Sequence, residues 1–478
     1  MRPAVELEIE RKYALSLEQD VPSLAGAVIE GPSNTYHLVA VYYDTPDRRL
    51  AADRLVIRRR TGGRDDGWHL KAPGQDADHR VELQLPIDPQ APGLIPDGFW
   101  DEVSERIGDQ PLIPVATLHT FRQERDLLGA DDSVLARLCI DEVHSQAGAH
   151  TDHWREAELE LAAGQLALLD ELEAVFAAAG IGRATDVAKI ARASGPATAE
   201  PSVTTAGSVV QAYLVAQLGA LQHWYRDPSG LPAGDAHDGR VACRRLRSVL
   251  GTFATVFASG ARGRLRTELR WLGLQLSPLR DAEVVADRLT GSGIEPAAEL
   301  AALVDGYRRD VLAPRRSSLE QSLDRPRVAA LLAGLDELMS GSALGAAADR
   351  DPQTLTALWR AAVRRVRTAV ETASHSSDEQ AWHDVRKAAK AVRYGAELLA
   401  PLGADFAERR AAWEQVTEQL GAVQDAAVTR AELGRLAATG APGKSAELLA
   451  ALERREAERQ RVALESGRTA VTAALQLN

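Results

Sequence analysis

Strict alternation of polar and apolar residues marks the stretch from Val5 to Tyr13, which reads V-E-L-E-I-E-R-K-Y. Its polar positions of one parity are Glu6, Glu8, Glu10 and Lys12. A period of two is typical of a β-strand, because successive side chains point to opposite faces. The pattern therefore predicts a strand that carries carboxylates and one ammonium group along a single face.

A second stretch, 154–161, repeats this pattern as W-R-E-A-E-L-E-L. Glu156, Glu158 and Glu160 alternate there with apolar residues. For one strand alone, the ordinary interpretation is a face in contact with water. If both acidic faces point inward, the carboxylates converge, and desolvated like charges need a cation to stay ionised. Clustered carboxylate oxygens favour Mg²⁺ or Mn²⁺ over zinc.

Six further segments between these two stretches have strand patterns. Two segments have helical spacing, one between the stretches and one after the second. The predicted strands are 37–45, 55–60, 68–71, 79–85, 115–128 and 133–145, and the predicted helices are 99–107 and 165–179. Nearly every strand has one apolar and one charged face. A closed barrel of eight strands is wide enough to hold one small ligand. We expect the charged faces to line its interior, because acidic strands begin and end the region and basic ones lie between them. The alternative is an ordinary apolar core with the charges outside.

From residue 207 the strand patterns give way to apolar residues at helical spacing. About ten helices are expected, among them 208–225, 236–256, 264–276, 354–373, 379–400 and 405–422. Apolar residues at this spacing over many segments are typical of helix bundles with short loops. The segment 194–206 has no hydrophobic period and contains two prolines, which predicts an exposed linker. We therefore predict an α+β multidomain protein with domains at 1–193 and 207–478.

The helical region contains an internal repeat. H-D-G-R-V-A-C-R-R-L-R at 237–247 matches H-D-V-R-K-A-A-K-A-V-R at 383–393. The shared basic or histidine positions are His237, Arg240, Arg244 and Arg247 in the first copy and His383, Arg386, Lys390 and Arg393 in the second. Their offsets of 0, 3, 7 and 10 fall within about 80° of a helix circumference. A repeated cationic stripe that faces its own copy would attract polyanions. A solvated helix face is the alternative.

Charge and composition separate the two regions further. Residues 1–200 hold 20 Lys and Arg against 35 Asp and Glu, whereas residues 201–478 hold 36 against 33. The excess of acidic residues therefore belongs to the first region. The two cysteines imply no disulfide framework. The N-terminus lacks the apolar core of a signal peptide, and no apolar run is long enough to span a membrane. We expect a cytoplasmic protein without a membrane partner.

The N-terminal region resembles CYTH domains, the triphosphate tunnel metalloenzymes. The resemblance rests on E-I-E-R-K at 8–12, which matches the motif E-x-E-x-K, and on an ordered series of charged positions down to 189. It implies an antiparallel eight-stranded β-tunnel that binds triphosphates with divalent metal. The implied phosphate-binding residues are Lys12, Arg58, Arg60, Lys71, Arg80, Arg122 and Lys189. Glu8, Glu10, Glu158 and Glu160 are the implied metal ligands, and we add Glu156 from the same strand.

The C-terminal region resembles the CHAD domain, a helical module with conserved histidines. This resemblance rests on the two H-D-x-R helices and on L-R-D-A at 279–282 and V-Q-D-A at 423–426. It implies binding of inorganic polyphosphate through a basic surface. The implied contacts are the eight repeated positions, to which we add Arg280 and Lys387. Nucleic acid is not expected as a partner, because few aromatic residues interrupt the basic stripe.

Together these features predict a hydrolase of inorganic triphosphate or related triphosphates, dependent on Mg²⁺ or Mn²⁺, with a helical domain that binds polyphosphate. Phosphoryl transfer needs positioning and charge neutralisation more than a covalent nucleophile. One alternative is an adenylate cyclase of the same tunnel family. Another is a non-catalytic protein that attaches to polyphosphate granules. The oligomeric state and the chain length of the substrate do not follow from the sequence.

Overall fold

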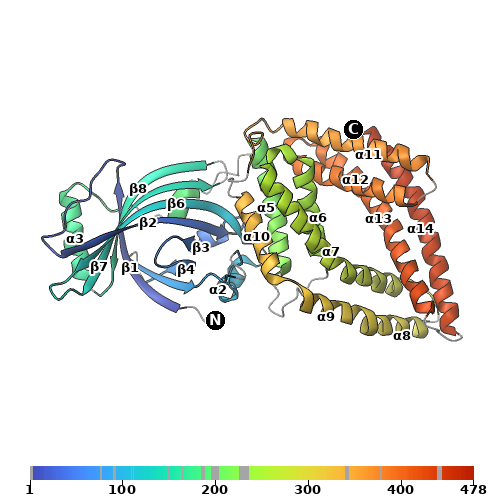
Figure 1. Cartoon of the computed structure of the whole chain (residues 1–478), viewed down its shortest axis with the longest axis horizontal. Helices are drawn as coiled ribbons and strands as arrows, with labels where there is room; N and C mark the ends of the chain where they lie inside the picture. The colour runs from blue at the N-terminus through green and yellow to red at the C-terminus, as the bar shows by residue number, and fades with distance from the viewer. Residues whose placement is uncertain are drawn as a thin grey trace. The chain divides into compact units, whose positions relative to one another are not determined.

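The computed structural model divides the chain into two compact units, residues 1–202 with 336–342 and residues 203–335 with 343–478 (Figure 1). It describes residues 4–477 apart from 76–77, 90–92, 109, 111, 148–149, 164, 185–188, 195–203, 226–235, 296, 340–343, 377–378 and 439–443. The central part of the predicted linker, 195–203, thus lies outside the described residues. The first unit is called the barrel unit below, and the second the helical unit.

Eight antiparallel strands form one closed barrel in the order β1-β5-β4-β3-β2-β6-β7-β8. They are β1 (Ala4–Leu15), β2 (Ile29–Asp44), β3 (Val56–Thr61), β4 (Gly67–Pro73), β5 (His79–Leu85), β6 (Ile113–Leu128), β7 (Val134–Ala147) and β8 (His150–Leu161). Four helices accompany them, α1 (Arg49–Ala52), α2 (Asp97–Ile107), α3 (Leu166–Ala178) and α4 (Lys189–Ser194). The predicted eight-stranded antiparallel tunnel is confirmed.

Helices cover parts of the barrel's outer wall and thereby bury the apolar strand faces. Tyr13 and Leu159 pack with Phe176 of α3 in one buried cluster. Trp68 and Leu70 pack with Phe99 of α2 in another. Because these strand residues point outward, the charged residues of opposite parity point inward.

A third apolar cluster lies inside the barrel. It contains Leu118 and Trp154, which have the same strand parity as Arg122 and Glu158 respectively. Helix α4 contributes Ile190 to this cluster and contacts β6, β7 and β8. Because α4 is anchored in this way, it carries the neighbouring Lys189 into the interior.

The largest difference in strand length from the prediction is at β2. β2 begins at Ile29, although its pattern predicts a start near residue 37. Its pairing with β6 shifts register between Glu30 and Ser33, where the chain reads E-G-P-S. Gly and Pro are poor strand formers and the bulge interrupts the alternation, so the pattern does not indicate a strand before residue 37.

The second unit is mostly helical, as predicted. Its helices are α5 (Ala206–Tyr225), α6 (Ala236–Thr252), α7 (Ser259–Thr290), α8 (Ala297–Tyr307), α9 (Ala313–Ser322), α11 (Thr354–Ser374), α12 (Glu379–Leu399), α13 (Asp405–Ala438) and α14 (Lys444–Gln476). Helix α10 (Arg325–Met339) belongs to this unit up to Leu335. Short 3₁₀ or π turns occupy Ala254–Val256, Arg308–Leu312 and Ala400–Leu402. None of the described helices is long and apolar enough to cross a membrane.

The predicted helices 264–276 and 405–422 are too short. α7 continues through Pro278 to residue 290, and α13 runs to residue 438. Proline in a helix interior removes one backbone hydrogen bond. Leu276 and Leu279 on either side of it are buried, so packing holds the helix together there.

The packing of the helices is consistent with the repeat. α5, α6 and α7 pack in sequence, and so do α11, α12 and α13. Between the two sets, α6 contacts α12 and α7 contacts α13. Since the repeat relates α5 to α11 and α6 to α12, the contact of α5 with α12 corresponds to that of α11 with α6, and both are present. This is the arrangement expected of two copies related by a pseudo-two-fold axis, and it places the two basic helices together.

Candidate functional site

A cavity of about 450 Å³ lies inside the barrel. All seven predicted phosphate-binding residues line it, together with Glu8, Glu10, Glu158 and Glu160, whereas Glu156 is absent from its lining. Six more charged residues line the cavity that were not among the predicted site residues, namely Arg54, Arg64, Arg137, Asp65, Glu82 and Glu124. The cavity therefore has ten basic and seven acidic side chains along its wall.

Glu158 lies at the centre of a cluster of cations. Its carboxylate accepts hydrogen bonds from Lys12 at 2.6 Å, from Arg122 at 2.7 Å and from Lys189 at 3.1 Å. Burial disfavours the charge on Glu158, but these three cations outweigh burial and hold its pKa well below the usual range. Glu158 is therefore a negatively charged anchor for cations of the protein itself.

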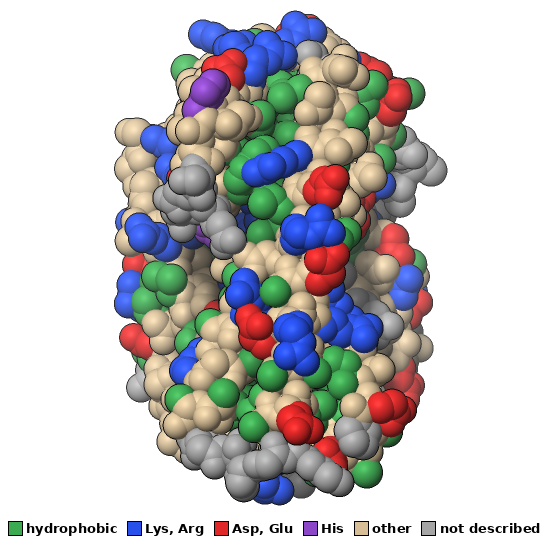
Figure 2. All heavy atoms as spheres, turned by 90° about the vertical axis from the view of Figure 1, so that its right-hand side faces the viewer, with side chains coloured by type: hydrophobic (Ala, Val, Ile, Leu, Met, Phe, Trp, Pro, Cys, Tyr) green, Lys and Arg blue, Asp and Glu red, His purple; other side chains and the backbone are tan. Residues whose placement is uncertain are grey.

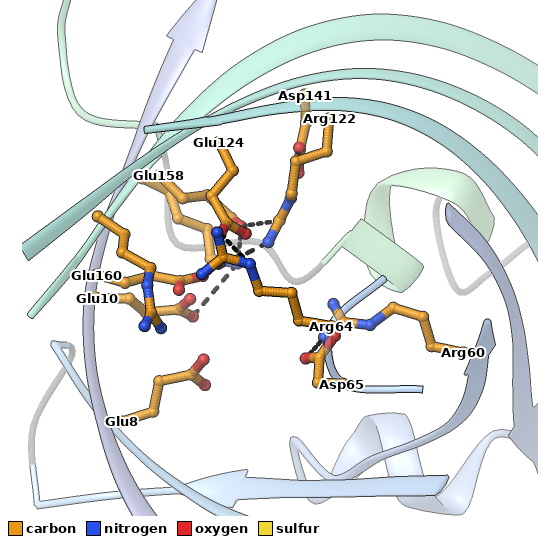
Figure 3. Close-up of polar contacts among 12 residues, drawn as sticks. Glu8, Glu10, Arg60, Arg64, Asp65, Arg122, Glu124, Asp141, Glu158 and Glu160 are labelled. Atoms are coloured by element: carbon orange, nitrogen blue, oxygen red, sulfur yellow. Dashed lines mark hydrogen bonds and ion pairs between the residues drawn. The ribbon is translucent and has the colours of Figure 1, made fainter. Parts of the chain in front are cut away.

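Asp141 is a further buried acid of this cluster, and it was not predicted as a site residue. It lies opposite Arg122 in the pairing of β6 with β7. Arg122 donates to both of its carboxylate oxygens at 2.8 Å, and Lys189 donates at 2.6 Å. The alternation of β7 places Asp141 on one face, but only the register between strands brings it to Arg122 (Figure 3).

The predicted acidic set is divided into two groups. The carboxylates of Asp141, Glu156 and Glu158 surround the Lys189 ammonium group, which lies 2.9 Å from Glu156. Glu8, Glu10 and Glu160 form a second group, in which the three ligand oxygens lie within 4.8 Å of one another. Figure 3 shows these three side chains together on one side of the interior.

The group of Glu8, Glu10 and Glu160 is suited to a divalent ion. Lys71 bonds to Glu8, and Lys12 lies 3.3 Å from Glu10. Burial raises the pKa of Glu160 to about 7, with the negative charges of Glu8, Glu158 and Glu10 acting in the same direction and Arg122 opposing. Three carboxylates this close together repel one another, and a bound cation would relieve that repulsion. Because the donors of this group are oxygens, the residues fit Mg²⁺ or Mn²⁺.

The opposite side of the cavity wall is basic. Arg58 and Arg60 lie on β3, and both are buried. Among the described residues, the Nε atoms of these two arginines have no hydrogen-bond partner. Burial and the repulsion of Arg58 and Arg122 lower the pKa of Arg60 to about 10. Buried donors without partners are costly, so this wall is suited to accept an anion.

The sequence indicates an inward position for some of these unpredicted lining residues and gives no such indication for others. Glu124 lies two residues after Arg122 on β6, and it was recognisable by parity. Arg64 and Asp65 lie in the turn between β3 and β4, where no periodicity applies. Asp65 pairs with Arg60, and Arg64 lies 3.3 Å from Glu124 (Figure 3).

In the helical unit, four of the predicted residues form what we call the basic cluster. It consists of Arg240 and Arg244 on α6 and of Arg386 and Lys390 on α12. Arg244 donates to the hydroxyl of Tyr394 on α12 at 2.8 Å. Burial and the charges of Arg244, Arg386 and Arg240 lower the pKa of Lys390 to about 6. Within the described residues no carboxylate lies within 4 Å of this ammonium group, and the Arg386 Nε atom has no hydrogen-bond partner.

Within the basic cluster, Arg240 lies 3.2 Å from Asp281. The other predicted helical residues lie outside the cluster, and several of them have acidic partners. Arg280 lies 3.4 Å from Glu283, Lys387 lies 3.1 Å from Asp384, and Arg393 bonds to Glu414. The surrounding protein partly desolvates the guanidinium group of Arg247, and this effect together with the charges of Arg270 and Arg266 lowers its pKa. His237 is exposed. The pKa of His383 is lowered by burial and by Lys387, Arg386 and Lys390.

Comparison with known proteins identifies both units. The model of the CYTH domain matches residues 6–193, and the model of the CHAD domain matches residues 209–434. Uncharacterized proteins from two strains of Mycobacterium tuberculosis are each 34% identical over 464 residues, which is 90% of this chain and 89% of the relative. The chain therefore belongs to the family of proteins that join a CYTH domain to a CHAD domain.

Solved structures are similar at a lower level. A CHAD domain from the plant Ricinus communis is 23% identical, with a TM-score of 0.46 over 56% of this chain and 91% of that one. A Hippeastrum protein described as a putative adenylyl cyclase with a dominant triphosphatase activity is 18% identical, with a TM-score of 0.25 over 38% of this chain and 93% of that one. At these values the similarities support no functional conclusion for this chain.

Proposed function

We propose that the barrel unit hydrolyses inorganic triphosphate, or a related triphosphate-containing substrate, with the help of Mg²⁺ or Mn²⁺. The observation that carries this proposal is the division of one cavity into an acidic group and a basic wall. Glu8, Glu10 and Glu160 form the acidic group, and Arg58 and Arg60 belong to the basic wall. A chain of phosphates with a bound divalent ion has the complementary distribution of charge.

The chain's own residues would bind and orient the phosphates. The unpartnered Nε donors of Arg58 and Arg60 supply hydrogen bonds to phosphate oxygens, and the buried setting strengthens each of them. Lys12 and Lys189 hold Glu158 and Asp141 in place beside the substrate. The divalent ion, when held by Glu8, Glu10 and Glu160, supplies charge neutralisation and a more acidic water. Fixed positions of this kind account for most of the catalysis in phosphoryl transfer.

The test is phosphate release from triphosphate, ATP and long-chain polyphosphate, with Mg²⁺, with Mn²⁺ and with EDTA. Glu10→Gln is expected to lower turnover of triphosphate at least about tenfold, because it removes one charged metal ligand. Arg58→Ala is expected to raise KM. Glu105→Gln is the matched control, since it makes the same chemical change on the exposed face of α2.

Two results would overturn the proposal. One is full turnover in EDTA, and the other is wild-type turnover by Glu10→Gln. Cyclic AMP as the main product from ATP would favour the cyclase alternative. Absence of any turnover in a folded protein that still binds triphosphate would favour a binding role for the barrel.

We infer in addition that the helical unit binds inorganic polyphosphate through the basic cluster. The supporting observation is the position of Lys390, which is half-buried among arginines. Arg240 pairs with Asp281 at 3.2 Å, but four cations held this close together still repel one another, and a flexible polyanion would relieve their repulsion. On the face of the helical unit in Figure 2, basic side chains are interspersed with acidic ones, so a local site is expected instead of a generally sticky surface.

Titration of the full chain with long-chain polyphosphate tests this second function. The Glu10→Gln background prevents loss of the ligand by hydrolysis in the barrel. Arg240→Glu combined with Arg386→Glu is expected to abolish binding, because each change removes a contact and adds repulsion. Wild-type affinity of this double variant, or a preference for duplex DNA in competition, would contradict the inference.

A further inference from the structure

Three histidines form a row on the outside of the barrel, away from the cavity. His119 on β6 is paired in register with His144 on β7, and His144 is paired with His153 on β8. Directly opposite residues on neighbouring strands have Cβ atoms about 5 Å apart. His153 alternates with the inward-pointing Trp154, so the row lies on the outer face.

Glu142 joins two of these histidines to form a compact set of ligand atoms. The rings of His144 and His153 are stacked, with centroids 4.1 Å apart. The Glu142 Oε1 atom lies 3.0 Å from Nε2 of His153 and 3.5 Å from Nε2 of His144. Metal–ligand bonds of about 2.0–2.1 Å at tetrahedral angles place two ligand atoms about 3.3 Å apart. The two separations lie on either side of this value, and rotation of the two imidazole rings out of their stack would point both Nε2 atoms at one ion.

The surroundings leave room for an ion and for a further ligand. A surface hollow of about 510 Å³ is lined by His119, His144 and His153, together with Thr117, Ser145 and Asp152. The side chains of His144 and His153 are 47% and 39% exposed, so an ion reaches them without any opening of the fold. Two imidazoles and one carboxylate leave a fourth tetrahedral position open, as in zinc sites that keep a water.

We propose that Glu142, His144 and His153 bind a divalent transition-metal ion, with Zn²⁺ as the expected ion in the cell. The donors decide this class of metal, because imidazole nitrogen favours Zn²⁺, Cu²⁺ and Ni²⁺ over Mg²⁺. The tunnel cavity offers only carboxylates to a metal and favours the opposite class. The protein thus has two metal sites on opposite sides of one barrel wall, selective for different ions.

The experiment is a calorimetric titration of the full, tag-free chain with Zn²⁺ in excess Mg²⁺, which occupies the tunnel carboxylates. His144→Ala and His153→Ala are each expected to weaken the tightest Zn²⁺ binding at least about tenfold, and Glu142→Gln is expected to weaken it to a smaller extent. His375→Ala is the matched control, because it removes an exposed histidine from the helical unit. Co²⁺ gives a second readout, since nitrogen ligands in tetrahedral geometry produce intense visible absorption.

Retention of wild-type Zn²⁺ affinity in His144→Ala or His153→Ala would overturn the proposal. So would loss of the tightest site in Glu10→Gln, because the ion would then be in the tunnel. Both histidines are exposed, and unchanged melting temperatures are expected to show that the variants fold. Failure of the triphosphatase assay leaves the proposal unaffected, because none of the three ligands lines the tunnel cavity.

Discussion

Lys12, Arg122 and Lys189 in the barrel all donate to one carboxylate, Glu158. The charged neighbours of Lys390 in the helical unit are instead mainly arginines, with Asp425 as an opposing charge. The cations of the two sites therefore have opposite electrostatic surroundings. Acidic partners raise the pKa of Lys12 well above its usual range against the effect of burial, while burial and like charges lower the pKa of Lys390. Glu158 already has its cations in the free protein, whereas among the described residues the four cations of the basic cluster have only Asp281 and Asp425 as opposing charges.

This difference indicates what each region requires of a ligand. The barrel has a local group of carboxylates at Glu8, Glu10 and Glu160, so we expect its ligand to include a cation as well as phosphates. For the basic cluster we expect an anion alone. The distribution of the acidic partners is therefore the basis on which we propose metal-dependent chemistry for one unit and polyanion binding for the other.

The largest expected effect is on the free energy of unfolding when one cation is removed from the barrel site or from the basic cluster. Arg122→Met leaves Asp141 and Glu158 buried with less compensation, and we expect a loss of about 3–5 kcal/mol in the local free energy of unfolding. Lys390→Met is expected to cost nothing or to stabilise, because it removes an amine whose charged form is disfavoured by burial and by the neighbouring arginines. Hydrogen exchange of the β6, β7 and α12 amides measures both effects.

Arg125→Met serves as the control for Arg122→Met. Arg125 lies on the same strand, its side chain is one-third exposed and it pairs with Glu30. A loss below about 1 kcal/mol is expected there. Equal losses for the two arginines would show that burial of the ion pairs does not distinguish them.

The second effect concerns salt. Four contacts from the basic cluster predict that polyphosphate affinity falls about 50-fold between about 50 and 200 mM salt, by the slope of roughly 0.7 per contact known for single strands. Triphosphate in the barrel is expected to respond by less than about tenfold, because buried charges are screened less. Titration and steady-state kinetics in the same salt series compare the two directly. Equal responses would remove the distinction between the sites.

The third effect concerns pH. Lys390 is mostly neutral above its pKa of about 6 in the free protein, and a bound polyanion raises this pKa. Binding therefore takes up a proton, and affinity is expected to fall about tenfold for each unit by which pH rises between the free and bound pKa values. Lys390→Arg stays charged and is expected to flatten this dependence. An unchanged slope in Lys390→Arg would assign the proton uptake to another group, with His383 the next to test.

The smallest expected effect defines the edge of the basic cluster. Lys387 is 60% exposed and lies 3.1 Å from Asp384, so Lys387→Gln is expected to change polyphosphate affinity by less than about threefold. Arg386→Gln, one residue earlier but half-buried on the clustered face, is expected to weaken it at least about tenfold. Comparable effects of the two changes would extend the site along the exposed face of α12.

Patterns of short range were sufficient to predict the fold. Alternation along each strand placed Glu10, Arg58 and Arg122 on inward faces, because parity depends only on neighbouring residues. Helical spacing and the repeated offsets likewise placed Arg240 and Arg386 on equivalent faces of two helices. The helix ends were less predictable, since buried leucines carry α7 past Pro278.

Contacts between strands and helices were decided by tertiary structure alone. The register of β6 with β7 brings Asp141 to Arg122, and the anchoring of α4 brings Lys189 to both Asp141 and Glu158. These contacts divide the predicted acidic set into a group around Lys189 and a group suited to a metal ion. The row of His119, His144 and His153 has the same origin. Register depends on pairing between segments that are distant in the chain, and no pattern within a single strand encodes it.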